Sequence, residues 1–344
     1  MSSRNFSMQA YWDRVAADWQ PRLSFDRQEH SDWPRWHDEA LAKLRDLMGD
    51  WPDRVDLNPV VEYSVQDSDL IRERIVLDTE AHMSVPCVLL RPKDMPADRK
   101  QAAILCSHGH GRYGKDPVAG IRSSAGHNAD IAAMNYNYAE QMARAGFLTL
   151  APDLRVFGER RDGEDPFPGR DPCNVNYVKG SILGLFPLTL NVWDLMRCVD
   201  YLQTRPEVDP ERIGMMGLSQ GGTMTTFTAA LEPRIKAADI IGYVNPWRRF
   251  GIERANFCGS QVVPQVYRYF DTHDIAGLIA PRPLLVEMGI YDSCFPIQDL
   301  LAGYAGVETI YRAAGAEQDL WQDIHPGPHA FAGNKAFEFF RRYL

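Results

Sequence analysis

Residues 212–222 read RIGMMGLSQGG, and this stretch decides the interpretation of the whole chain. It begins as a strand-like apolar run, and residues 224–232, MTTFTAALE, favour a helix directly afterwards. The motif GLSQG, residues 217–221, lies between them. A glycine on each side of Ser219 permits a tight strand-to-helix turn in which larger side chains would collide with neighbouring backbone. The pattern therefore predicts that Ser219 is an exposed nucleophile.

Strand-like and helical runs alternate on both sides of this motif. An antiparallel hairpin is predicted over residues 71–80 and 83–92. Further strands are predicted in AAILCSHGHG (102–111), FLTLAPD (147–153), IKAADIIGYV (235–244) and PLLVEMGIYD (283–292), with helices in 135–146, 188–202 and 334–344. This alternation predicts an α/β fold with a mostly parallel sheet of about eight strands and helices on both faces.

Two levels of organisation are expected along the chain. Residues 1–60 are predicted to form an N-terminal helical arm or cap, and residues 61–344 a catalytic domain. Two loop-rich insertions, near 112–134 and 246–275, are long enough to act as lids over a site.

A serine hydroxyl is a poor nucleophile near pH 7, so it needs a base that is itself oriented by an acid. Behind a GxSxG elbow the acid and then the histidine follow the serine in the chain. Asp292 comes just after the apolar run PLLVEMGIY, and His329 lies in a loop shortly before the final helical segment. Ser219, Asp292 and His329 are the predicted catalytic residues.

Three other acids and histidines in this region are alternatives to those two. Glu287 falls inside the apolar run, so we expect it to be buried and bonded to backbone. Asp299 is expected to be a solvated helix residue, and His325 stays open as an alternative base.

The loop SHGHG, residues 107–111, ends an early strand and has the position of an oxyanion loop. We predict that the backbone N–H groups of His110 and Gln220 bind the oxyanion, and that His108 supports the loop by hydrogen bonding. An alternative interpretation is that His108, His110 and His127 converge on a metal. No carboxylate or cysteine accompanies them with ligand spacing, so no metal and no cofactor are predicted.

Two further features bear on the surroundings of the site. Asp153 and Arg155 are expected to pair with each other at a strand end beside the elbow. Trp247, in the aromatic-rich late insertion, and Tyr113, in the early one, are predicted to line the substrate pocket.

The segments SHGHG, APDLRVFGER, GLSQGG, PRPLLVEMGIYDSCFP and PGPHAF occur in this order and resemble α/β-hydrolase esterases related to acetyl xylan esterases and dienelactone hydrolases. The resemblance covers about residues 70–344 and implies a serine esterase acting on small acyl esters, with acetyl groups and acylated sugars as candidates. The chain departs from these relatives at three places: Val156-Phe157 interrupts an Arg-Gly-Gln motif, Ala330 replaces a glutamate, and Ser219 replaces the cysteine of dienelactone hydrolases.

Composition limits the classes of partner. The 344 residues carry a formal net charge of −9 without a basic run, which argues against nucleic acid and anionic membranes. No uninterrupted apolar stretch reaches about 18 residues. The start, MSSRNFSMQAYWDRV, has no signal-peptide core, and the cysteines are scattered, so a reducing cytoplasm is expected. A homo-oligomer is compatible with this composition.

Two alternatives to an esterase remain at this stage. A serine peptidase of the prolyl-oligopeptidase type has a similar elbow, although 344 residues leave no room for its propeller domain. A binding protein that kept the fold and lost catalysis is the other, and the intact Ser, Asp and His candidates argue against it.

Overall fold

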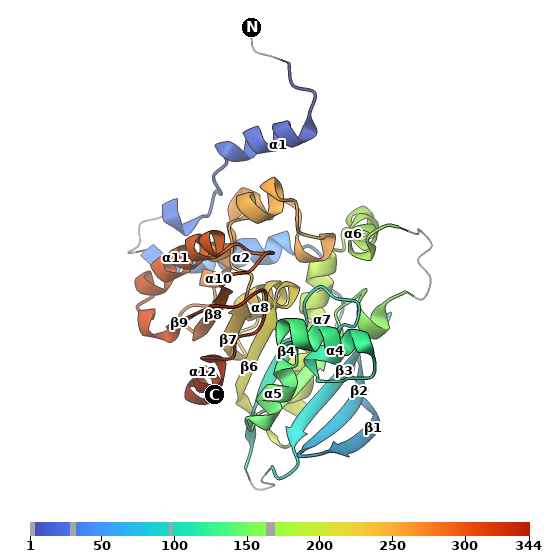
Figure 1. Cartoon of the computed structure of the whole chain (residues 1–344). Helices are drawn as coiled ribbons and strands as arrows, with labels where there is room; N and C mark the ends of the chain where they lie inside the picture. Colours follow the sequence, from blue (N-terminus) through green and yellow to red (C-terminus); the bar gives the residue numbers. More distant parts are fainter. Residues whose placement is uncertain (1–3, 28–31, 96–98, 163–168) are drawn as a thin grey trace.

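The computed structural model describes residues 4–27, 32–95, 99–162 and 169–344. At its centre is a nine-stranded sheet with the order β1-β2-β3-β5-β4-β6-β7-β8-β9 (Figure 1). The strands are β1 Val60–Asp67, β2 Leu70–Glu80, β3 Met83–Pro92, β4 Gln101–Ser107, β5 Leu148–Pro152, β6 Val208–Leu218, β7 Ile235–Ile241, β8 Leu284–Gly289 and β9 Leu320–His325.

Strand direction divides the sheet into two parts. The β1, β2 and β3 strands form an antiparallel meander, and β3 joins β5 in antiparallel register. From β5 to β9 every neighbouring pair is parallel. Because the carboxyl ends of parallel strands share one edge, the loops after β4, β6, β8 and β9 all open on the same side.

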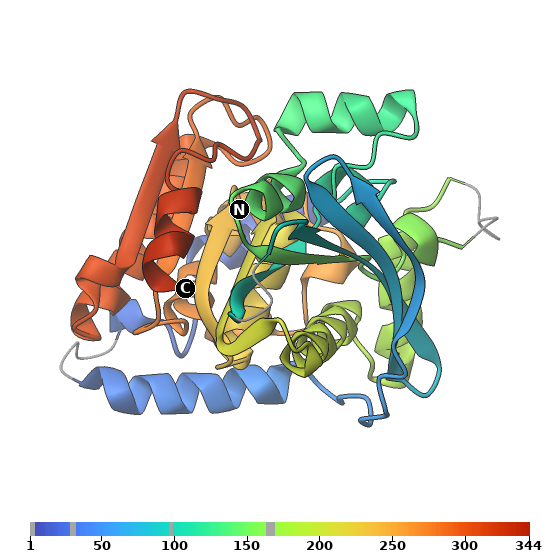
Figure 2. The ribbon, with the colours of Figure 1, turned by 90° about the horizontal axis from the view of Figure 1, so that it is seen from below.

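Helices cover both faces of the sheet, as the view from below shows (Figure 2). Alternate residues of β4 point to opposite faces: Ala103 and Leu105 belong to one core, and Ile104 and Cys106 to the other. The first core includes α2 Trp33–Leu47, α7 Pro187–Thr204, α8 Gln220–Leu231, α10 Thr272–Gly277 and α11 Ile297–Ala313. The second includes α5 Tyr138–Arg144 and α12 Ala336–Tyr343.

The predicted α/β architecture is confirmed, with additions that the apolar pattern did not reveal. Strand β1 was not predicted, because it is an edge strand whose residues are all exposed and it carries no burial pattern. Strand β9 mixes polar and apolar residues in LWQDIH. The arm itself contains α1 Met8–Ala17 and α2.

Both insertions contain short helices. Residues 112–134 include α3 Lys115–Val118 and α4 Ala125–Met134. Residues 246–275 include a π-helix, η4 Arg248–Glu253, a 3-10 helix, η5 Gly259–Gln261, and α9 Val266–Tyr269. Between the two insertions in sequence lies α6 Pro172–Leu183, which the sequence analysis did not predict.

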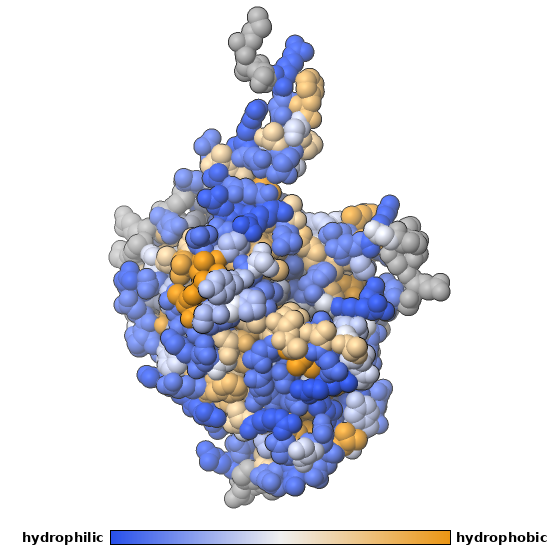
Figure 3. Space-filling model, in the orientation of Figure 1, coloured by the Kyte–Doolittle hydropathy of each residue, from blue (hydrophilic) through white to orange (hydrophobic). Residues whose placement is uncertain are grey.

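The surface in Figure 3 is mostly hydrophilic, and its apolar side chains gather in separate patches. Within the described ranges, no single helix is long and apolar enough to cross a membrane. Only α6 and α7 taken together meet that criterion, and they are bent by 94°.

Candidate active site

The turn from β6 into α8 holds Ser219 in a strained backbone conformation. Ser219 has φ 64° and ψ −118°, a region that side-chain-bearing residues rarely occupy. Close contacts with neighbouring backbone require glycine at positions 217 and 221. A Cβ on Gly217 would lie 2.8 Å from the Ser107 carbonyl oxygen, and one on Gly221 only 2.2 Å from it. This turn has the geometry of a nucleophile elbow, with the serine at the carboxyl edge of the sheet.

The loop after β4 passes directly beside the elbow. A Cβ on Gly109 would lie 3.3 Å from the Cβ of Ser219 and 2.8 Å from the Leu218 carbonyl oxygen, so only glycine fits there. His110 follows on this loop. Gln220 is the first residue of α8, and an amide at that position has no carbonyl one turn earlier to bond. The two amides predicted to bind an oxyanion therefore belong to segments that flank Ser219.

Asp292 and His329 come together from the loops after β8 and β9. The His329 Nδ1 lies 2.6 Å from Asp292 Oδ2, and the other oxygen, Oδ1, accepts N–H groups of Cys294 and Phe295, both at 2.8 Å. The Phe295 ring stacks on the imidazole with centroids 5.4 Å apart. Gly242 gives room for this pair, because a Cβ there would lie 3.2 Å from the ring. The far nitrogen, Nε2, is buried and has no hydrogen-bond partner among the described residues.

Ser219 and His329 line one cavity of about 500 Å³. Its wall includes Gly109 and His110 from the oxyanion loop, and three phenylalanines, Phe250, Phe257 and Phe295. Ser219 and His329 thus line one shared space together with apolar rings. Such an arrangement can activate a hydroxyl for attack on an acyl carbon.

The comparisons with known proteins agree with this fold. The pattern of the acetyl xylan esterase family matches residues 190–275, a span that includes the elbow. YtaP of Bacillus subtilis, described as a hydrolase, is 29% identical over 280 residues, which are 78% of this chain and 88% of that protein. A Bacteroides fragilis structure assigned as an acetyl xylan esterase superposes with a TM-score of 0.75 at 18% identity, over 94% of this chain and 83% of that one. The chain has the α/β-hydrolase fold.

A glucuronoyl esterase from Solibacter usitatus has the same fold, with a TM-score of 0.65 at 17% identity over 89% of this chain and 91% of that one. The resemblance to α/β-hydrolase esterases is confirmed, since the matched family and these neighbours are carboxylic ester hydrolases. The predicted enzyme class, a carboxylic ester hydrolase, is confirmed at that level.

The alternative acid and base candidates of this chain lie in other surroundings. Glu287 is fully buried in β8 and accepts the Ala332 N–H at 2.9 Å, as expected for a structural carboxyl. Asp299 lies half-buried in the first turn of α11. His325 ends β9 and is buried, and it is His329 that bonds Asp292.

The two predicted pocket residues do not line the cavity that holds Ser219, which corrects their assignment. Trp247 is 3% exposed: its backbone N–H donates to Asp271 Oδ1, and its ring packs behind that of Phe257, with centroids 4.9 Å apart. Tyr113 packs against His127 and lines a separate cavity of about 470 Å³. The aromatic side chains that line the cavity with Ser219 are those of Tyr136, Phe250, Phe257 and Phe295.

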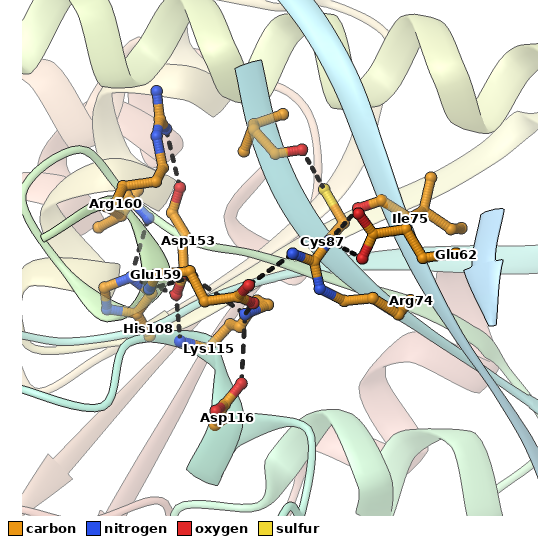
Figure 4. Close-up of polar contacts among 12 residues, drawn as sticks. Glu62, Arg74, Ile75, Cys87, His108, Lys115, Asp116, Asp153, Glu159 and Arg160 are labelled. Atoms are coloured by element: carbon orange, nitrogen blue, oxygen red, sulfur yellow. Dashed lines mark hydrogen bonds and ion pairs between the residues drawn. The ribbon is translucent and has the colours of Figure 1, made fainter. Parts of the chain in front are cut away.

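The expected pair between Asp153 and Arg155 is also corrected, because each has other partners. Asp153 is fully buried and contacts Lys115 Nζ at 3.0 Å (Figure 4). Arg155 forms two hydrogen bonds with Asp194. Burial alone would lower the pKa of Lys115, but Asp153 and the nearby carboxylates raise it above its usual value. A charged Lys115 therefore neutralises a carboxylate buried beside the oxyanion loop.

His108 supports the oxyanion loop as predicted. Its Nε2 accepts the Leu154 N–H at 2.9 Å, and its Nδ1 lies 2.7 Å from the Gly109 carbonyl oxygen. Burial lowers the pKa of His108, which favours the neutral ring that can accept at Nε2 and donate from Nδ1.

The structure contains one cluster of possible metal ligands that spacing in the sequence does not reveal. Cys173 and Cys258, 85 residues apart in the chain, lie with His110 so that their sulfur and nitrogen atoms are within 4.8 Å of one another. The interaction between the two thiols lowers the pKa of Cys258 and raises that of Cys173. Only a three-dimensional structure brings these segments together, so no local motif could have shown them.

The first test concerns the elbow. Gly221→Ala would place a methyl group 2.2 Å from the Ser107 carbonyl oxygen, so β4 and α8 must separate. We expect a loss of roughly 1–3 kcal/mol in the free energy of unfolding, measured by urea denaturation. Gly111→Ala is the matched control, since a Cβ there meets nothing within 4 Å. Equal stability of the two variants would contradict the close packing described.

A second test concerns the carboxyl beneath the site. Burial raises the pKa of Glu287 from 4.5 to about 8, so folded protein keeps a proton that unfolded chain loses between these values. The contribution of this proton to the free energy of unfolding is complete below pH 4.5 and is lost as the pH rises to about 8. Glu287→Gln should therefore flatten the fall of unfolding free energy over this range, by up to about 1.4 kcal/mol per pH unit.

Urea denaturation at several pH values between 5 and 8 measures this slope. Glu338→Gln, at an exposed position of α12, serves as the control and should keep the wild-type slope. Identical slopes in wild type and Glu287→Gln would show that the carboxyl is already ionised in the folded protein.

Proposed function

We propose that this chain is a serine ester hydrolase that cleaves short acyl esters through a covalent acyl-enzyme. The observation that carries the proposal is the Asp292–His329 hydrogen bond beside a cavity that Ser219 shares. The match to the acetyl xylan esterase family supports the same reaction type.

In the proposed mechanism His329 Nε2 accepts the proton of Ser219 as the hydroxyl oxygen attacks the acyl carbon. Asp292 holds the imidazole by Nδ1 and stabilises its cationic form, while its own second oxygen stays fixed by two backbone N–H groups. The N–H groups of His110 and Gln220 stabilise the oxyanion, and each lowers the activation barrier by about 3 kcal/mol.

His329 then returns the proton to the departing alcohol, and the acyl group stays on Ser219 as an ester. In the second half of the reaction His329 removes a proton from water, which attacks the acyl carbon. Collapse of the second tetrahedral intermediate releases the carboxylic acid and restores the serine hydroxyl.

The surroundings favour a small acyl group. The rings of Phe250 and Phe295 stack 4.1 Å apart, and Phe257 packs edge-on against Phe250. Interlocked rings of this kind leave little freedom for a long alkyl chain beside Ser219. An acetyl group fits this reasoning, and an acetylated sugar is the substrate class suggested by the acetyl xylan esterase family.

The third test removes single groups from the proposed triad. Ser219→Ala should abolish hydrolysis of p-nitrophenyl acetate and labelling by a fluorophosphonate, because the acceptor oxygen is gone. Asp292→Asn should lower kcat by roughly 10⁴-fold, since the amide cannot stabilise the imidazolium. Ser181→Ala, on the exposed face of α6, is the control and should behave as wild type. Circular dichroism verifies folding, and full activity of Ser219→Ala would rule out the mechanism.

The fourth test is a substrate panel for the wild-type enzyme. We expect kcat/KM to fall from p-nitrophenyl acetate through butyrate to octanoate, and acetylated xylo-oligosaccharides to release acetate. A proline-specific peptide substrate included in the same panel should remain intact. Faster turnover of octanoate than of acetate would contradict the small acyl site, and rapid peptide cleavage would favour a serine peptidase.

A further inference from the structure

The wall of the cavity contains a group of soft ligands that the proposed mechanism does not use. The side chains of Cys173 and Cys258 are buried, and the imidazole of His110, an exposed residue of the loop after β4, faces them. Their three donor atoms lie within 4.8 Å of one another. We propose that His110, Cys173 and Cys258 form a zinc-binding site in the wall of the active-site cavity.

The spacing of the donors fits a tetrahedral metal. With Zn–S bonds of about 2.3 Å and Zn–N bonds of about 2.0–2.1 Å, a tetrahedron has S···N edges of about 3.6 Å and S···S edges of about 3.8 Å. The Cys173 Sγ lies 3.6 Å from His110 Nε2. The remaining separations, which are at most 4.8 Å, reach these values after small side-chain rotations.

The main chain around the ligands is already fixed. Cys173 lies in the first turn of α6, where its N–H bonds Asp171 Oδ1 at 2.8 Å. The Gly259 N–H donates to Asn174 Oδ1 at 2.8 Å, which ties the segment after Cys258 to the same helix. Both cysteines are therefore presented from segments that are joined without a metal.

Outer hydrogen bonds resemble those that orient ligands in metal sites. Gln261 Nε2 donates to Cys258 Sγ at 3.5 Å, and Ser260 Oγ lies 2.9 Å from the same sulfur. Ser260 in turn accepts a hydrogen bond from Gln220 Nε2 at 3.0 Å. The outer contacts thus extend to the residue that follows the nucleophile.

The ligand types select the ion. Two cysteine sulfurs and one imidazole suit zinc, whereas calcium and magnesium require oxygen ligands. Three protein ligands leave a fourth position, and His110 and Cys258 both line the cavity, so a water molecule can fill that position from the cavity side. A disulfide between the cysteines would use the two sulfurs but would leave the facing imidazole without a role.

A zinc ion here would link three segments that are far apart in the chain: the oxyanion loop, the start of α6 and the segment before η5. Since the unfolded chain does not hold the three ligands together, binding stabilises the folded state. The proposed role is therefore to fasten the wall of the cavity, separately from the hydrolytic steps.

The test measures metal binding directly on the full chain, reduced and freed of metal with a chelator. One equivalent of Co²⁺ should produce visible bands of a tetrahedral ion and a near-ultraviolet sulfur-to-cobalt absorption. One equivalent of Zn²⁺ should displace it and raise the Tm. Cys173→Ser and Cys258→Ser should each weaken binding by at least about 100-fold. His110→Gln should weaken binding in the same way, and because His110 is exposed this variant replaces a cysteine variant that fails to fold.

Two control variants make the outcome specific. Cys294→Ser removes a half-buried thiol outside the cluster and should bind zinc as wild type does. Ser219→Ala should also bind normally, so metal binding and the proposed hydrolysis fail independently. The site would be overturned if reduced protein showed no sulfur-to-cobalt absorption, or if the cysteine variants bound zinc as tightly as wild type. It would also be overturned if thiol titration of protein kept without reductant found only four of the six thiols, which would indicate a disulfide.

Discussion

The close approach of two backbones at the elbow is the constraint on which the site depends. The Ser107 carbonyl oxygen occupies the space where side chains of Gly217 and Gly221 would lie. Because β4 and β6 are neighbours in the parallel sheet, this contact sets the oxyanion loop against the start of α8. The strained φ of Ser219 follows from the same turn, since the chain must reverse within one residue to begin the helix. Contact between these segments therefore fixes Ser219 and the two amides predicted to bind an oxyanion.

The acid and the histidine are located by the remaining strands of the same edge. Strands β8 and β9 are parallel neighbours, so Asp292 and His329 leave the sheet side by side. A carboxylate with 1% of its side chain exposed must have its charge compensated. Two N–H groups at one oxygen and the imidazole at the other supply that compensation, and they also fix the direction of the ring.

The sequence predicts what depends on local pattern and fails where partners come from distant segments. The elbow, the hairpin and the buried parallel strands follow from glycine spacing and apolar runs. The Asp292–His329 contact follows from chain order together with strand ends. Exposed β1 has no burial pattern to detect. Periodicity does not encode how the insertions fold over the sheet. That folding decides the partners of Asp153, the position of Trp247 behind Phe257, and the contact of Cys173 with Cys258.

The oxyanion loop is held from two sides by different chemistry, and this explains why a short glycine-rich segment can be positioned accurately. On one side His108 bonds Leu154, and the buried Asp153–Lys115 pair fixes the loops around it. On the other side the ring of His110 faces two sulfurs and packs edge-on against Phe157. Glycine at position 109 permits the close approach to Ser219 but supplies no side-chain contacts of its own. The histidines on either side supply them, so the SHGHG segment combines backbone freedom with two separate anchors.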